Sequence, residues 1–345
     1  MSDHNVLLVG SVPLADSSTV FRTLAERLGT VASAYPDGET GDRLAFVNWH
    51  RQKLYERPEV EVVQEIPYEM PVKGKLRYYR MKPGKRVSDL PLRPLGYSEV
   101  AKESYEKFRR LRATGEIPRG TRFQVSLPTA LILSTGLKDP FEERYPPFEQ
   151  AMLAELSDIS AAIPHDDLTV QWDAPSETHP EEAARHPDRA SAISIRDWTF
   201  EQAIAALARL CDAVPRDVKM GVHLCYGDIG GRHIMQPHDT SVMVDCFNAL
   251  SAKSLRPIDY VHMPVPIDRN DDAYFAPLDG LQLEATQLFL GLVHPEDGVS
   301  GARTKIAAAR RYKSVFGVGC ECGLGRRAPE SIPALLDLHR EVAAL

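Results

Sequence analysis

The chain has 345 residues, of which 43% are hydrophobic and 26% charged, so it can bury a sizeable core and does not have the composition of a disordered chain. Its 48 acidic and 41 basic side chains give a net charge of −7, which argues against a non-specific nucleic-acid binder. Five cysteines in a chain of this length disfavour a disulfide framework and favour metal-binding or catalytic use.

The amino-terminal residues carry no signal for export or membrane insertion. Residues 1–4 contain no basic residue, and the apolar run at residues 6–9 is far shorter than a signal peptide core or a membrane span. We therefore expect a soluble, cytoplasmic protein with no membrane partner.

Short apolar runs alternate with helical patterns along the whole chain. The runs are continuous rather than alternating, as in parallel strands that are covered on both faces. The predicted strands are residues 6–12, 30–34, 123–127, 168–173, 218–225, 260–265, 287–293 and 315–320.

Helices are predicted between these strands. Thr199 and Gln202 form a capping-box pattern, and Ile204, Leu207 and Cys211 share one face of the helix that follows. Further helices are predicted between Ser98 and Gly115 and over residues 301–312 and 331–344. Eight strands with intervening helices predict a single (β/α)8 TIM barrel over residues 1–345. The rival is an open doubly wound sheet, which the single Gly10 after the first strand disfavours.

Residues 50–120 are a long, charged insertion between the second and third predicted strands. Within it, residues 73–86 hold seven basic side chains in fourteen, interleaved with Tyr78 and Tyr79. One interpretation is a solvated hairpin packed over the barrel mouth, and the other is a lid that attracts an anionic substrate tail. A contact between two copies in a homodimer is a third role for this segment.

A candidate metal site lies at the ends of two predicted strands. His223 and Cys225 stand two residues apart on the fifth strand, so their side chains point to the same face. Cys322 follows the eighth strand, which lies across the barrel mouth from the fifth. One imidazole and two thiolates suit Zn²⁺. Cys320 is an alternative ligand to Cys322, whereas Cys211 and Cys246 are expected to be buried as small apolar residues.

Other polar residues end neighbouring strands at the same rim. The acidic loop at residues 37–43, which contains Glu39, can grip an ammonium group, and Asp173 also faces the mouth. Ser11 can hold a carboxylate, and His294 has the chemistry of a general acid. Each of these residues has an ordinary structural interpretation as well, but a barrel brings all of them together.

The order of these motifs resembles the C-terminal catalytic barrel of cobalamin-independent methionine synthase. The resemblance covers essentially residues 1–345, without the separate N-terminal barrel of that family. The motifs that carry it are Gly10-Ser11, Gly38-Glu39, Gln171-Trp172-Asp173-Ala174-Pro175, His223-Leu224-Cys225-Tyr226 and Cys322-Gly323-Leu324 followed by basic residues.

The resemblance implies a zinc-dependent methyltransferase that makes methionine from homocysteine, with 5-methyltetrahydrofolate or a corrinoid as the methyl donor. By this carry-over His223, Cys225 and Cys322 are zinc ligands. Ser11, Glu39 and Asp173 would hold the amino-acid part of the thiol substrate, with Asp173 and His294 as catalytic residues. His294 would assist proton transfer to the leaving group.

This sequence departs from the family pattern at three points. The family's glutamate ligand ends the sixth strand, where residues 261–266 contain no acid, and Glu284 is the next acidic candidate. Residues 126–134 lack the tryptophan that the family associates with folate, and the N-terminal barrel is missing. Three alternatives therefore stay open: a transferase for another thiol such as coenzyme M, a metal-free barrel enzyme resembling uroporphyrinogen decarboxylase, and a binding protein without activity.

Overall fold

The computed structural model describes residues 6–45, 47–69, 73–189, 197–229 and 232–345. Seven parallel strands form one curled sheet in the order β1-β4-β5-β6-β9-β10-β11. The strands are β1 (Ala34–Pro36), β4 (Arg122–Pro128), β5 (Leu168–Ala174), β6 (Lys219–Leu224), β9 (Tyr260–Pro264), β10 (Gln287–Gly291) and β11 (Gly317–Val318).

The segment of residues 6–12 closes the gap between the two edges of this sheet. Val6 bridges both Ala32 and Val318, and Ser11 bridges Gly38, all in parallel orientation. The expected strand over residues 6–12 is thus present as isolated bridges and not as a regular strand. With this segment the architecture is that of a TIM barrel, as predicted.

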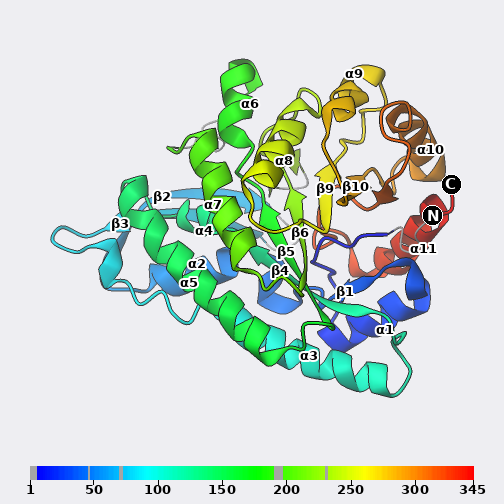
Figure 1. Ribbon diagram of the computed structural model, residues 1–345. Helices are drawn as coiled ribbons and strands as arrows, with labels where there is room; N and C mark the ends of the chain where they lie inside the picture. Colours follow the sequence, from blue (N-terminus) through cyan, green and yellow to red (C-terminus); the bar gives the residue numbers. More distant parts are fainter. Residues whose placement is uncertain (1–5, 46, 70–72, 190–196, 230–231) are drawn as a thin grey trace.

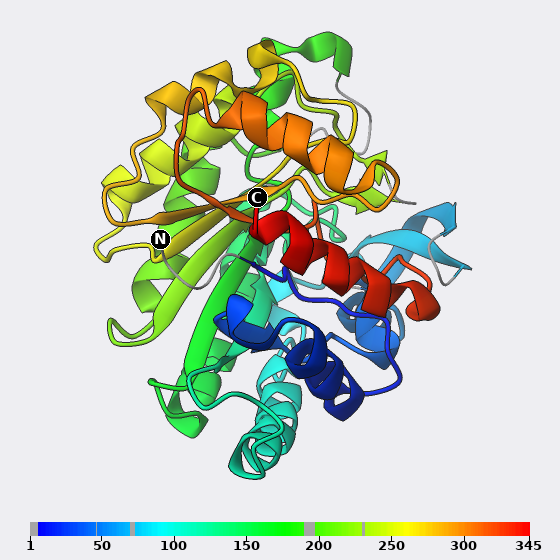
Figure 2. The same cartoon turned by 90° about the vertical axis from the view of Figure 1, so that its right-hand side faces the viewer.

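Helices surround the sheet and connect consecutive strands, as Figures 1 and 2 show. Figure 2 places α1, near the amino terminus, beside α11 at the carboxyl end, so the helical layer is continuous across the point of closure. The α-helices are α1 (Ser17–Arg27), α2 (Asn48–Tyr55), α3 (Tyr97–Ala113), α4 (Ala130–Ser134), α5 (Phe141–Ala162), α6 (His179–Arg185), α7 (Phe200–Ala213), α8 (Ser241–Lys253), α9 (Asp272–Phe275), α10 (Gly298–Ala309) and α11 (Ile332–Ala343). Short 3₁₀ helices cover Gly29–Val31, Gly41–Ala45, Val87–Asp89, Pro187–Arg189, Ala276–Gly280 and Pro329–Ser331.

The predicted helix signals act as expected at the helix termini. The Thr199 hydroxyl accepts a hydrogen bond from the Gln202 backbone N–H at 3.1 Å, and the Gln202 side chain accepts from the Thr199 N–H at 2.8 Å. This capping box satisfies two backbone donors that the first turn of α7 leaves unpaired. The apolar faces of the helices join the strands in one continuous core that runs from Val6 to Val342 and includes Cys211 and Cys246.

Two predicted strands are shifted or shortened. The prediction of residues 30–34 was displaced, because Gly29 adopts a φ of 52° and starts a 3₁₀ turn that delays the strand to Ala34. The prediction of residues 315–320 was too long, since Val315 lies outside the strand and is 76% exposed.

The long segment between β1 and β4 contains an antiparallel hairpin, β2 (Val60–Glu69) and β3 (Lys73–Met81). It lies at the left of Figure 1, on the side opposite α10 and α11. Tyr79 is fully buried, and its backbone N–H donates to the carbonyl of Gly136 at 2.9 Å. The helix α3 belongs to the outer layer of the barrel, where it packs against α1, α5 and β4, so the additional material precedes it.

Several basic side chains of the hairpin pair within the hairpin itself. Lys75 and Arg77 both reach Glu65, at 2.8 Å and 2.7 Å, and Arg80 reaches Glu61 at 2.7 Å. This neutralisation weakens the electrostatic argument for a lid that attracts an anionic tail. The small two-stranded pair β7 (Asp228–Ile229) and β8 (Arg232–His233) follows β6. Within the described residues, no helix combines the length and the apolar character needed to cross a bilayer.

Candidate functional site

The site grows from one layer of side chains inside the barrel. Asp173 on β5 is the neighbour of His223 on β6, and His223 is the neighbour of His262 on β9. Two residues earlier on each strand, Gln171, Gly221 and Tyr260 form the layer below. Side chains two apart on a strand share a face, so the barrel interior presents the upper layer toward the carboxyl ends of the strands.

Three sulfur and nitrogen donors meet at this rim. The donor atoms of His223, Cys225 and Cys322 all lie within 4.8 Å of one another. His223 is 2% exposed and Cys225 is also 2% exposed. The structure therefore brings together the three residues that the sequence predicted as metal ligands, although more than ninety positions separate Cys225 from Cys322.

The thiol of Cys322 lies among groups that favour its ionised form. Hydrogen bonding from Cys225, then from His223, holds its pKa well below the ordinary thiol range, against the effect of burial. The Nη2 atom of Arg326 also lies 3.7 Å from the Cys322 sulfur. The thiolate is the form of cysteine that binds metals, so this sulfur suits a metal site.

The loop that carries Cys322 is held by Ser11. The backbone N–H of Gly325 donates to the Ser11 hydroxyl at 3.1 Å, and the N–H of Leu324 donates to the Ser11 carbonyl at 2.8 Å. A Cβ atom at Gly323 would lie 2.2 Å from the Ser11 Oγ atom, so a side chain there would turn this hydroxyl away from the Gly325 N–H. Ser11 thus supports the ligand loop, and its role in binding substrate stays a prediction.

Two carboxyl groups lie close to these donors, Asp173 buried and Glu39 half-buried. Burial, followed by the charge of Glu39, raises the pKa of Asp173 well above its ordinary value, and Cys322 adds to the effect. Burial also raises the pKa of Glu39 to about 8, while the Arg43 guanidinium opposes the rise. Clustered negative charges of this kind are stabilised when a cation binds among them.

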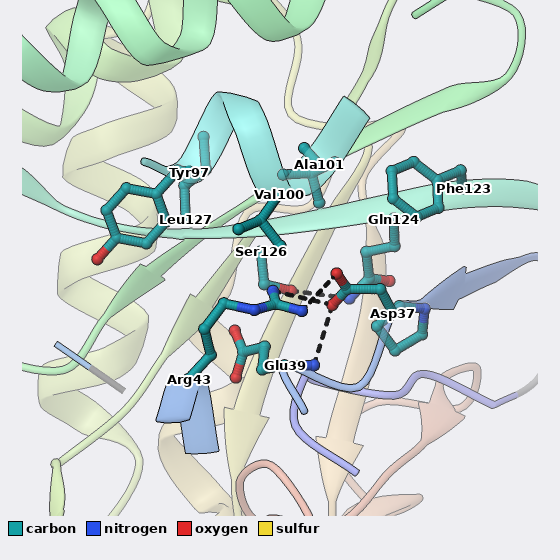
Figure 3. A pocket seen from close by; sticks show the side chains of 12 residues that line it. Asp37, Glu39, Arg43, Tyr97, Val100, Ala101, Phe123, Gln124, Ser126 and Leu127 are labelled. Atoms are coloured by element: carbon teal, nitrogen blue, oxygen red, sulfur yellow. Dashed lines mark hydrogen bonds and ion pairs between the residues drawn. The ribbon is translucent and has the colours of Figure 1, made fainter. Parts of the chain in front are cut away.

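The loop around Glu39 is built on Asp37. The Glu39 N–H donates to Asp37 at 2.9 Å, Arg43 binds the same carboxylate at 2.7 Å, and the Ser104 hydroxyl donates to it at 2.7 Å. Figure 3 shows the Arg43 guanidinium directed at Asp37, with Glu39 beside it and Ser126 and Gln124 on the opposite wall. A Cβ atom at Gly10 would lie 3.2 Å from the Glu39 Oε1 atom, which places this carboxyl group against the first segment of the barrel.

His294 lies in a different environment. Its Nε2 atom is 2.8 Å from the carbonyl oxygen of Val265, and its ring is 3% exposed. Burial lowers its pKa, and the charge of Lys305 acts in the same direction, whereas Glu321 opposes the shift. His294 is not part of the three-donor group, so its catalytic role stays a prediction.

Two candidate ligands lie elsewhere. Glu284 was a wrong candidate: its residue is exposed, and it precedes the amino end of β10 and thus lies at the end of the barrel opposite the donors. Cys320 belongs to the apolar core, and burial raises the pKa of its thiol to about 12. None of the five cysteines forms a disulfide.

The sequence analysis gave no role to four residues that the structure places in or beside the site: His262, Gln171, Tyr260 and Arg326. The Gln171 amide donates to Asp173 at 2.8 Å and accepts from the Tyr260 hydroxyl at 3.2 Å, so it orients that carboxyl group. His262 Nδ1 lies 2.7 Å from Nδ1 of His223. Gln171 stands two residues before Asp173, so the strand period of two was the available signal.

Comparison with known proteins supports the fold at low sequence identity. No protein-family model matches the chain, and no curated protein matches it. A B12-independent methionine synthase from Shewanella sp. W3-18-1, solved with selenomethionine, superposes with a TM-score of 0.59 at 14% identity, over 99% of this chain and 96% of that one. A methyltransferase from Methanosarcina mazei gives a TM-score of 0.47 at 13% identity, over 97% and 94% of the two chains. The homocysteine methyltransferase MmuM from Escherichia coli gives a TM-score of 0.41 at 13% identity, over 76% of this chain and 78% of that one. The first of these structures shares the overall fold of the present chain.

Proposed function

We propose that this protein is a zinc-dependent thiol methyltransferase, with the conversion of homocysteine to methionine as the leading assignment. The observation that carries the proposal is the convergence of His223, Cys225 and Cys322 within 4.8 Å at the rim of the barrel. The fold shared with a methionine synthase solved with selenomethionine supports the same reaction class.

The donor set fits a catalytic zinc ion. One imidazole and two thiols are borderline-soft ligands, and three protein ligands leave a fourth position for substrate. The Nε2 atom of His223 is buried with no nitrogen or oxygen partner within the described residues, and the ring lies within reach of the Cys322 thiol, which supports a metal ion shared between this nitrogen and that sulfur. A bound Zn²⁺ would supply positive charge that lowers the pKa of an incoming thiol and so provides a nucleophile at neutral pH.

The carboxyl groups of Asp173 and Glu39 favour a thiol substrate that carries an ammonium group. Asp173 and Glu39 place two acids beside the three donors, and an ammonium group between them would offset their raised pKa values. Homocysteine carries such a group, whereas coenzyme M does not. We therefore favour an amino-acid thiol over coenzyme M as acceptor, and the soft donor set favours metal chemistry over a metal-free decarboxylase.

The reaction balances with either donor. The new S–CH₃ bond forms as the donor's methyl bond breaks. A folate-type donor leaves with its electron pair on nitrogen, which takes a proton, whereas a corrinoid keeps the electron pair on cobalt and needs none.

We propose that His294 delivers the proton to the folate nitrogen, so His294→Gln should lower kcat about 10²-fold or more with 5-methyltetrahydrofolate. Turnover with methylcobalamin should change little, and an equal loss with both donors would contradict this role.

The direct test combines metal analysis with a thiol panel. Purified protein should hold about one zinc per chain, and Cys225→Ser should remove most of it. Cys246→Ser is a matched control, because that cysteine is buried in the apolar core. Homocysteine and coenzyme M, each with 5-methyltetrahydrofolate or methylcobalamin, are scored for thioether product. Full zinc retention by the Cys225 variant would refute the metal centre.

A further inference from the structure

His262 is a buried histidine in direct contact with a proposed metal ligand. Its Nδ1 atom lies 2.7 Å from Nδ1 of His223, on the neighbouring strand. We propose that His262 is a positioning residue, which holds Nδ1 of His223 so that Nε2 of His223 faces the metal. This inference rests on the metal centre proposed above and assigns how one of its ligands is oriented.

The surroundings of His262 form a slot of defined shape. The residue is fully buried, and two glycines leave the space that its ring fills. A Cβ atom at Gly291 would lie 2.9 Å from His262 Cε1, and one at Gly319 would lie 3.4 Å from Nε2. A side chain at Gly291 would therefore press on the ring, and a Cβ atom at Gly319 would lie in van der Waals contact with it. The imidazole is held between Gly291 of β10, Gly319 just after β11, and His223.

The distance between the two rings identifies a hydrogen bond and not a shared metal. Two nitrogens bound to one tetrahedral Zn²⁺ at about 2.0–2.1 Å would stand roughly 3.3 Å apart. The observed 2.7 Å is shorter than that and lies within hydrogen-bond range. His262 Nδ1 is thus a partner of the ligand and does not occupy the fourth metal position.

In this proposal, the contact with His262 determines which nitrogen of His223 can bind the metal. A metal-binding imidazole is neutral, and it donates its remaining N–H to an outer partner. With the proton of His223 on Nδ1, donation to His262 Nδ1 leaves the Nε2 lone pair free. His262 then carries its own proton on Nε2, beside Gly319.

His262 also connects the two halves of the metal centre. A Cβ atom at Gly291 would meet both the Cys320 carbonyl oxygen, at 2.7 Å, and Cε1 of the His262 ring, at 2.9 Å, so the ring lies close to the backbone of Cys320, two residues before Cys322. One imidazole therefore contacts His223 on β6 and lies close to the segment that leads to the Cys322 loop. Loss of His262 should loosen the geometry of ligands that it does not itself provide.

The test measures zinc affinity, independently of catalysis. His262→Phe keeps an aromatic ring but removes the acceptor, and it should weaken Zn²⁺ binding about 10–100-fold in competition with a chromophoric chelator. His262→Asn places an oxygen about where Nδ1 stood, so its affinity should lie closer to that of the wild type. His339→Phe is the control for substitution of a fully buried histidine, and its affinity should match the wild type.

A second measurement needs no variant. Nitrogen-15 NMR of the zinc-loaded protein should show one histidine coordinated through Nε2, with a hydrogen-bonded proton on Nδ1. Coordination through Nδ1, or by two histidines, would overturn the inference. Unchanged affinity in His262→Phe, while Cys225→Ser loses zinc, would also overturn it and leave the metal centre standing. Absence of zinc binding by the wild type would instead refute the proposed function, and the inference with it.

Discussion

The carboxyl group of Asp173 is buried, yet a side-chain amide holds it in place. Gln171 donates to it at 2.8 Å, and burial, followed by the charges of Glu39 and Cys322, raises its pKa. A buried carboxyl group oriented in this way gains most from a positively charged partner. The residue thus combines a defined direction with a need for a cation, which suits an ammonium-binding role.

Asp173→Asn should therefore weaken binding of an amino-acid thiol. Loss of a charged hydrogen bond corresponds to about 1.5–3 kcal/mol, or roughly a 10–100-fold rise in Kd for homocysteine. Calorimetric titration of the zinc-loaded variant measures this change. The desamino analogue 4-mercaptobutanoate provides the control, because its affinity should be nearly the same for both proteins. Equal losses for the two thiols would contradict the assignment.

At the scale of elements, the Cys322 loop depends on one close approach. A side chain at Gly323 would meet Ser11 Oγ at 2.2 Å, so Gly323→Ala must displace Ser11 or the loop itself. The variant keeps all three donors and should still bind zinc at least about 10-fold more weakly. A chelator competition assay measures the change. Gly120→Ala, with no atom within 4 Å of the added methyl group, should bind zinc as the wild type does.

The helix α11 carries a buried titratable group of its own. His339 is fully buried with Nδ1 at 2.7 Å from the Leu335 carbonyl oxygen, and burial lowers its pKa to about 4. The folded-state pKa lies below the unfolded value, so the unfolded chain binds the proton more readily. The stability that this neutral histidine contributes is present above about pH 6.5 and is lost as the pH falls toward 4.

His339→Phe should remove this acid sensitivity. Between pH 7 and pH 5 the wild type should lose about 2 kcal/mol of unfolding free energy relative to the variant. Urea unfolding at both pH values, followed by circular dichroism, gives the comparison. Parallel pH dependence in the two proteins would show that His339 does not titrate as its burial implies.

At the scale of the whole molecule, the proposed metal centre joins distant parts of the barrel. His223 and Cys225 lie at the end of β6, whereas Cys322 follows β11 near the point where residues 6–12 close the sheet. A ligand that binds only the folded state stabilises it by mass action. A metal bound at this position would therefore stabilise the closure of the barrel as well as supply chemistry.

Zinc should accordingly raise the resistance of the whole chain to unfolding. At a free zinc concentration 1,000 times the Kd, the gain is about 4 kcal/mol. Thermal unfolding of chelator-treated protein, with and without added zinc, measures the shift in Tm. Cys322→Ser should show little or no shift, and a wild-type shift of the same size in that variant would indicate zinc binding elsewhere.

The period of the apolar runs and the motif order predicted the barrel and the grouping of three donor side chains at its rim. Continuous apolar runs specify buried parallel strands, and residues that end such strands meet at one rim. That rule brought His223, Cys225 and Cys322 together correctly, although the last is far from the others in the chain. Strand ends were less predictable, because Gly29 and the closing segment near Val6 depend on local backbone geometry.

By itself, the sequence determined the fold class, the grouping of His223, Cys225 and Cys322 and the burial of Cys211 and Cys246, because periodicity and residue chemistry are local properties. Only the tertiary structure decided the outer partners of those donors. The contact of His262 with His223 depends on strand register and on two glycines from other strands. The pairing of Lys75 and Arg77 with Glu65 similarly depends on the hairpin register. Contacts across strands are set by packing, which no single stretch of sequence encodes.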